Sequence, residues 1–221
     1  MINQQLQLDV SDELAWDSKV DSEGITVSVD GASVTLRGTV GSFRQKREAQ
    51  KAAERVYGVR HVDNHLSVRI LTRHEDDDLC AYVRRALRLD VLVPATVDVR
   101  VRSGFVTLIG TVEKQCQRDE AAYVAGNVRG VTGVRNDLSL TSRALLTSDA
   151  RHWIRRALVR NAKLDADSIG VWTVNGTVIL TGTVSCWADR DSAVAAAWAA
   201  PGVIDVDDRL ELLLSEAAKD R

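Results

Sequence analysis

The apolar positions of this chain follow two spacings, one typical of helices and one typical of strands. Three segments carry an apolar stripe at i, i+4 and i+8, which predicts amphipathic helices. The stripes are Leu6, Val10 and Leu14; Leu79, Val83 and Leu87; and Ala150, Ile154 and Leu158. Each stripe is followed by a segment with β-branched residues at alternate positions, beginning at Ile25, Val97 and Ile169. This alternation predicts a strand with one buried face.

A second strand pattern sets the period of the whole chain. Val-Thr-Leu-x-Gly-Thr-Val occupies residues 34–40 and 106–112, and a close variant occupies 178–184. The glycines of this pattern, Gly38, Gly110 and Gly182, stand 72 residues apart, and a Gly-Val pair keeps the same interval at Gly58, Gly130 and Gly202. Two separated motifs in one register predict three copies of one structural unit. We place repeat 1 at residues 1–70, repeat 2 at 71–142 and repeat 3 at 143–221.

Each repeat is completed by a second helix and a last strand. The helix has a face of small residues and ends before Gly58, Gly130 or Gly202, where a left-handed C-cap is expected. Because the last strand is reached through this helix, we expect it to lie parallel to its neighbour by a right-handed crossover. The predicted fold class is α+β: three tandem α-β-β-α-β modules, each a small three-stranded mixed sheet with two helices packed on it. A module this small buries only about 60% of its unfolded surface, so packing between modules is also expected.

These motifs resemble the BON domain family (bacterial OsmY and nodulation-associated repeats). The resemblance rests on Gly31, the strand motif at 34–40, Ala49, Ala52, Ala53, Gly58, Val59, Val62, Asn64, Leu66 and Val68, and all three copies fit. It implies a stress-associated protein that binds anionic phospholipid or envelope components. A relative in the family senses potassium ions, so the resemblance also leaves open an ion-binding sensor that uses backbone carbonyls.

Composition and charge exclude several classes of protein. The 221 residues are 45% hydrophobic and 27% charged, and the formal net charge of −2 argues against a nucleic-acid binder. No apolar run reaches the roughly 18–20 residues that span a bilayer, so no transmembrane segment is expected. The first residues lack the basic start and apolar core of a secretory signal, which favours a cytoplasmic location.

No recognisable catalytic motif is present, and we predict a non-enzymatic protein without catalytic residues, metal or cofactor. The sequence lacks a nucleophile elbow, a phosphate-binding loop, a dinucleotide fingerprint and a Cys-x-x-Cys pair. Cys80, Cys116 and Cys186 lack metal-ligand spacing, which indicates reduced thiols.

Two clusters have the composition of metal ligands. His61 and His65 share a strand face and are interpreted as solvated residues rather than ligands. The acidic run after His74, residues 75–78, precedes a helix and is expected to favour its N-terminal dipole.

Two surface features predict a binding role. Basic residues gather on predicted helices at Arg44, Lys46, Arg47, Arg84, Arg85, Arg155 and Arg156. They suit either an anionic phospholipid surface or a partner protein, or they keep the helices soluble. Trp198 lies opposite the small-residue face of its helix and is expected to point outward, as an apolar anchor or a contact between repeats. The leading hypothesis is phospholipid binding; the alternatives are a potassium-ion sensor and a protein-interaction scaffold.

Overall fold

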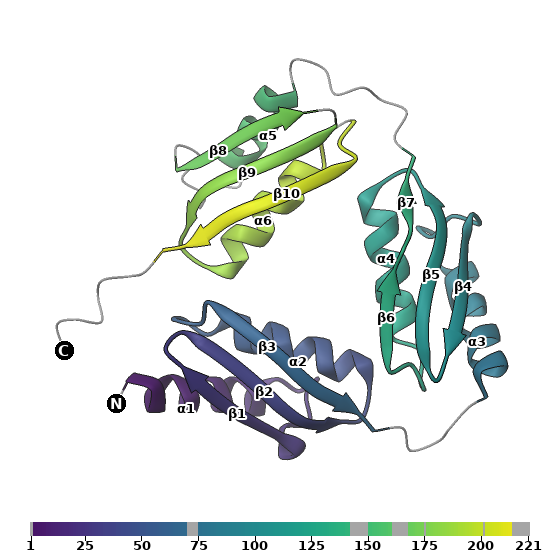
Figure 1. Cartoon of the computed structure of the whole chain (residues 1–221), viewed down its shortest axis with the longest axis horizontal. Coiled ribbons are helices and arrows are strands. Elements are labelled where there is room, and N and C mark those ends of the chain that lie inside the picture. Colours follow the sequence, from purple (N-terminus) through teal and green to yellow (C-terminus); the bar gives the residue numbers. More distant parts are fainter. Residues whose placement is uncertain are drawn as a thin grey trace. The chain divides into compact units, whose positions relative to one another are not determined.

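The computed structural model describes residues 2–69, 75–141, 150–160, 168–174, 176–200 and 202–213 (Figure 1). Repeat 1 contains α1 (Ile2–Trp16), a 3-10 turn (Ser22–Gly24), β1 (Ile25–Asp30), β2 (Ser33–Val40), α2 (Phe43–Arg55) and β3 (His61–Val68). Repeat 2 contains α3 (Asp76–Leu89), β4 (Val97–Arg102), β5 (Phe105–Val112), α4 (Gln115–Gly126), β6 (Gly133–Asn136) and β7 (Ser139–Leu140). Repeat 3 contains α5 (Ala150–Arg160), β8 (Ile169–Val174), β9 (Thr177–Val184), α6 (Trp187–Trp198) and β10 (Asp205–Leu212).

The predicted α-β-β-α-β order is confirmed in each repeat, and so is the mixed sheet. The second strand is central: β1, β4 and β8 pair with it in antiparallel fashion, and β3, β6 and β10 pair with it in parallel. In repeat 2 the last strand is interrupted, so β6 and β7 both pair with β5. The Asp137 N–H still donates to the Leu108 carbonyl across the interruption.

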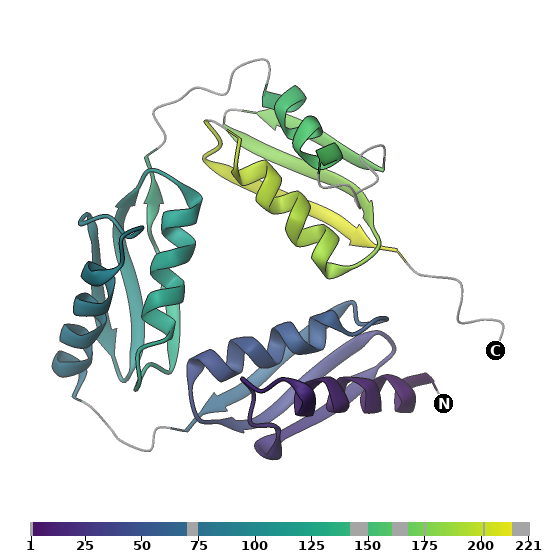
Figure 2. The same cartoon turned by 180° about the vertical axis from the view of Figure 1, so that it is seen from behind.

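Both helices of a repeat cover the same face of its sheet, as Figures 1 and 2 show from opposite sides. Alternate strand residues such as Val34, Leu36 and Val40 point into this helix-covered face and are buried. Ala49, Ala52 and Ala53 of α2 are fully buried, and their small size lets the helix lie close to the sheet. Repeats 2 and 3 build equivalent cores. None of the helices in the described ranges is long and apolar enough to cross a bilayer.

The glycine of each central strand lies where a neighbouring backbone approaches. Gly38, Gly110 and Gly182 have φ angles of +124°, +122° and +112°. A Cβ at any of them would overlap the carbonyl oxygen of the residue that precedes the first strand. These residues are Gly24, Thr96 and Ser168, respectively. Both the backbone angle and the lack of space therefore require glycine.

Gly58, Gly130 and Gly202 are not the C-caps of the second helices that the sequence predicted. The second helices end three or four residues before these glycines, at Arg55, Gly126 and Trp198. Gly58, Gly130 and Gly202 have φ between +85° and +98° and occupy a turn closed by a backbone hydrogen bond across it. A turn residue at this position needs positive φ, which glycine adopts at little cost. These glycines therefore turn the chain toward the last strand.

A polar side chain ties the last strand to the second helix in every repeat. In repeat 1 the Asn64 amide donates to the Lys46 carbonyl at 2.8 Å, and its oxygen accepts from the Leu66 N–H at 3.2 Å. Asn136 makes the same two bonds in repeat 2, to Arg118 and Leu138.

Repeat 3 has Asp208 at this position instead of asparagine. Asp208 still accepts from the Leu210 N–H, at 3.0 Å. Its second oxygen cannot donate, and it accepts from the Arg190 guanidinium at 2.8 Å instead. The exchange of Asn for Asp therefore preserves the connection, because a side-chain ion pair replaces the bond to a carbonyl.

Repeats 1 and 2 also pack against each other, within a unit that comprises residues 1–140. Phe43 of α2 packs on the core of repeat 2. The Arg47 guanidinium lies 5.1 Å from the ring centroid of Tyr123, and it donates to Asn127 Oδ1 at 3.3 Å. Gly126 leaves room for the Phe43 and Arg47 side chains, because a Cβ at this position would stand 3.0 Å from the Phe43 ring. The expected packing between modules is confirmed for this pair.

Candidate binding surfaces

The basic residues predicted on α2 of repeat 1 have different surroundings. Arg44 is exposed, whereas Lys46 and Arg47 are half-buried. Burial lowers the pKa of Arg47, and its guanidinium contacts α4, where it also donates to the Ala122 carbonyl. Arg47 therefore holds repeats 1 and 2 together, and of these three side chains Arg44 is the most accessible to an external partner.

On α3 of repeat 2 the two predicted arginines also differ. Arg84 forms an ion pair with Asp98 at 3.0 Å, whereas Arg85 is exposed. The pKa of Asp98 is lowered, mainly because its carboxylate accepts the Val99 N–H and then because of Arg84. Since Asp98 stays ionised beside Arg84, this pair adds little net positive charge to the surface.

The acidic run before α3 has a structural role. Asp76, Asp77 and Asp78 occupy the first turn of the helix, where negative charge is favourable. The Asp76 carboxylate also accepts hydrogen bonds from the N–H groups of Ser103 and Gly104 in the β4–β5 turn, at 2.6 and 3.0 Å. His74 lies outside the described residues, as do the side chains of Ala150 and Leu158.

The exposed side of α5 in repeat 3 combines an aromatic ring with two cations. Arg155 and Arg156 are exposed as predicted, and Trp153 beside them is 51% exposed. The Arg156 guanidinium lies 5.8 Å from the Trp153 ring centroid. We refer to Trp153, Arg155 and Arg156 as the α5 surface. The sequence contained a signal for Trp153, because this residue lies off the predicted stripe whose member Ile154 is fully buried.

Trp198 does not have the outward orientation that the sequence suggested. Its side chain is half-buried and packs, with that of Val194, against the core of repeat 3. An indole is long enough to fold back from the flank of a helix onto the apolar residues beside it. The structure thus places Trp198 at the margin of its own core, and Trp153 is the more exposed tryptophan.

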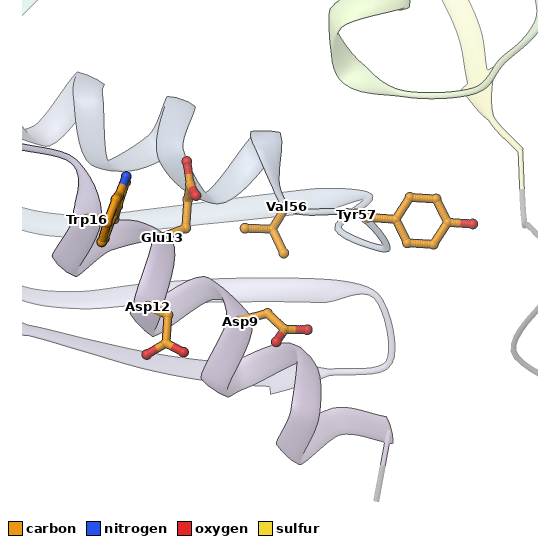
Figure 3. A pocket seen from close by; sticks show the side chains of 6 residues that line it. All are labelled: Asp9, Asp12, Glu13, Trp16, Val56 and Tyr57. Atoms are coloured by element: carbon orange, nitrogen blue, oxygen red, sulfur yellow. The ribbon is translucent and has the colours of Figure 1, made fainter. Parts of the chain in front are cut away.

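An open groove lies between α1 and the end of α2 in repeat 1. Figure 3 shows its lining residues, which are Asp9, Asp12, Glu13, Trp16, Val56 and Tyr57. Two of the carboxylates already have partners, since Glu13 accepts from Arg55 at 2.9 Å and Asp9 accepts from Gln5 at 2.8 Å. The lining residues include no cysteine, serine or histidine that could serve as a nucleophile or a neutral-pH base.

The predicted histidine pair is solvated. His61 and His65 are both exposed, and the His61 ring lies 3.0 Å from an Asp63 carboxylate oxygen. Across the described ranges, no group of three or more His, Cys, Asp or Glu side chains is close enough to hold a metal ion. Cys80, Cys116 and Cys186 are free thiols.

Comparison with known proteins identifies the repeated unit. The sequence model of the BON domain matches residues 3–70, 75–142 and 148–213. Osmotically-inducible protein Y of Escherichia coli (strain K12) is 37% identical to this chain over 126 residues. The matched segment covers 54% of this chain and 63% of that protein, so this chain spans less than two thirds of its curated relative.

Solved structures show a more distant likeness. CdsD, a structural protein of the type III secretion system of Chlamydia trachomatis, is 16% identical, with 97% of this chain and 95% of that chain covered and a TM-score of 0.26. The PrgH periplasmic domain is 10% identical, with 87% and 96% covered and a TM-score of 0.22. Both scores are too low to bear on fold or function.

Proposed function

This chain belongs to the BON domain family, and we propose that it is a non-enzymatic, osmotic-stress-associated protein that binds the surface of anionic phospholipid bilayers. The stress association is supported by its similarity to an osmotically-inducible protein. The proposal that no reaction is catalysed is supported by the repeats themselves, which keep the apolar framework and vary the polar residues. The expected cytoplasmic location remains a prediction.

The observation that carries the lipid proposal is the composition of the α5 surface. Tryptophan favours the boundary between headgroups and acyl chains, where its ring is apolar and its N–H is solvated. Arg155 and Arg156 lie beside Trp153 and are exposed. Each arginine contributes about 1 kcal/mol near an anionic membrane. Together with partial burial of one indole, this gives weak and reversible association.

Reversing the charge of the α5 surface is expected to abolish most of this binding. We expect Arg155→Glu/Arg156→Glu to bind vesicles rich in phosphatidylglycerol at least tenfold more weakly than the wild type, because two attractions become repulsions. Co-sedimentation with vesicles measures the effect. Binding should also weaken between 0.1 M and 1 M salt, as the Debye length falls from about 10 Å to about 3 Å.

The matched control is Arg84→Glu/Arg85→Glu, which reverses the same number of charges at the equivalent place in repeat 2. Because Arg84 is already paired with Asp98, we expect this variant to bind within about threefold of the wild type. Vesicles of phosphatidylcholine alone should bind none of the three proteins appreciably. Equal losses from the two variants, or negligible wild-type binding to anionic vesicles, would refute the α5 surface as the lipid contact.

A further inference from the structure

The face of each sheet that the helices leave uncovered differs sharply among the three repeats. We call it the open face, and it consists of the strand residues that alternate with the buried ones. The open face of repeat 1 carries small polar residues in its centre, such as Ser28 and Thr35. The open faces of repeats 2 and 3 instead carry exposed aromatic residues, Phe105 and Trp172, and opposite charges. These two faces belong to different compact units of the chain.

The open face of repeat 2 is basic. The register places Arg100 opposite Thr107, and Thr107 opposite Arg135, so the two arginines flank one threonine across the sheet. Arg102 lies beside Phe105, which is 44% exposed. Arg135 is paired with Asp137 at 2.8 Å. Within the described ranges no ion pair neutralises Arg100 or Arg102, so this face has a net positive charge.

The open face of repeat 3 is acidic and more apolar. Trp172 and Val174 are 56% and 55% exposed, and Trp172 lies opposite Ile179. The strand on the other side of β9 contributes the charged residues, which are Asp205, Asp207, Arg209 and Glu211. Asp207 is paired with Arg209. No described cation pairs with Asp205 or Glu211, so this face has a net negative charge.

From this complementarity we propose that the chain associates with a second copy of itself, the open face of repeat 2 on one chain docking on the open face of repeat 3 on the other. The face of repeat 2, with the exposed Phe105 and basic charges, would meet the face of repeat 3, with the exposed Trp172 and acidic charges. Contacts between two basic faces or two acidic faces are disfavoured by repulsion. The contact is therefore heterologous, and repeated use of it builds rings or open chains of molecules.

The size of the faces sets the strength of this contact. Three strands about 4.8 Å apart, with about six residues at roughly 3.3 Å each, cover only about 14 Å by 20 Å. This area, about 280 Å² on each face, is well below the roughly 800 Å² per partner of a standard interface, so the encounter is weak and transient. Association is therefore expected at tens to hundreds of micromolar protein. An anionic bilayer is a poor occupant of the repeat 3 face, because Asp205 and Glu211 would repel it.

Sedimentation equilibrium of the wild-type protein tests the proposal directly. At 0.1 M salt the average mass is expected to rise above that of one chain between about 10 μM and about 1 mM protein. At 1 M salt the rise should shrink, because the charges are screened. A mass that stays at one chain over the whole range at low salt would overturn the proposal.

A charge swap tests which faces meet. Arg100→Glu/Arg102→Glu makes both faces acidic, and Asp205→Arg/Glu211→Arg makes both basic, so each variant alone should associate at least tenfold more weakly than the wild type. Mixing the two variants should restore association, because each then offers a face of the sign that the other lacks. Failure of the mixture to associate would contradict the proposed pairing, even if both variants remain monomeric.

Arg37→Glu is the control, because Arg37 lies on the open face of repeat 1, which carries no large exposed apolar residue. This variant should self-associate like the wild type. Equal weakening by Arg37→Glu would mean that net charge alone controls association. The lipid proposal is tested separately, because none of these substitutions changes the α5 surface. Arg100→Glu/Arg102→Glu and Arg37→Glu should keep their vesicle binding, whereas Asp205→Arg/Glu211→Arg removes the repulsion at the repeat 3 face and does not serve in that test.

Discussion

Replacing Gly38 with alanine is expected to lower the stability of repeat 1 by about 3 kcal/mol or more. The new Cβ would overlap the Gly24 carbonyl oxygen, which belongs to the backbone and cannot rotate away. The residue would also keep a φ near +124°, which an L side chain rarely adopts. Native-state hydrogen exchange at the amides of β2 measures the loss repeat by repeat.

The matched control is Gly31→Ala in the β1–β2 turn. Gly31 also has a positive φ, of +60°, but no atom lies within 4 Å of where its Cβ would be. Its substitution should therefore cost only about 1 kcal/mol, the ordinary cost of a left-handed backbone. Equal destabilisation by the two substitutions would show that close approach of the backbone does not explain the strand glycines.

Replacing Asn136 with leucine is expected to destabilise repeat 2 by about 2–3 kcal/mol. Leucine would leave the Arg118 carbonyl and the Leu138 N–H without the partners that Asn136 supplies at 2.7 and 3.3 Å. Partly buried polar groups that lose a hydrogen bond cost about 1–3 kcal/mol each. Chemical denaturation followed by circular dichroism, together with hydrogen exchange in β5, measures the change.

Asn136→Asp is the informative comparison, because aspartate is the natural residue at the equivalent position of repeat 3. The new carboxylate would keep the hydrogen bond from the Leu138 N–H. The Arg118 side chain is near enough to reach this carboxylate, since Arg118 Nη2 lies 3.4 Å from the backbone carbonyl oxygen of Asn136. This would reproduce the pair of Arg190 and Asp208. We expect a loss of less than about 1 kcal/mol; a loss as large as that for leucine would contradict the proposed equivalence.

The order of elements and the sheet topology were predictable because they depend on local patterns that occur three times. The strand glycines were predictable for the same reason, since one residue recurs at one place in the register. The interruption between β6 and β7 was not predicted, because Asp137 and Leu138 fit the repeating pattern of a continuous strand.

The surfaces were harder to predict than the cores. Arg47 looks like any exposed helix arginine in the sequence, because its contacts with Tyr123 and Asn127 come from another repeat. The predicted outward orientation of Trp198 is wrong because helical spacing gives only the direction of the Cα–Cβ bond. A long side chain can fold back from that direction. The charged residues of the two open faces can be read from the sequence, but only the strand register shows which of them share a face.

The central claim is that the α5 surface inserts Trp153 at an anionic bilayer, and tryptophan emission tests it most directly. Adding phosphatidylglycerol vesicles should shift the wild-type emission to shorter wavelength, because the indole leaves water for the bilayer boundary. The same shift is predicted for Trp16→Phe, which removes a tryptophan that is 88% exposed in repeat 1, and it should be lost in Trp153→Phe. A shift that persists in Trp153→Phe, or no shift in the wild-type protein, would contradict the account.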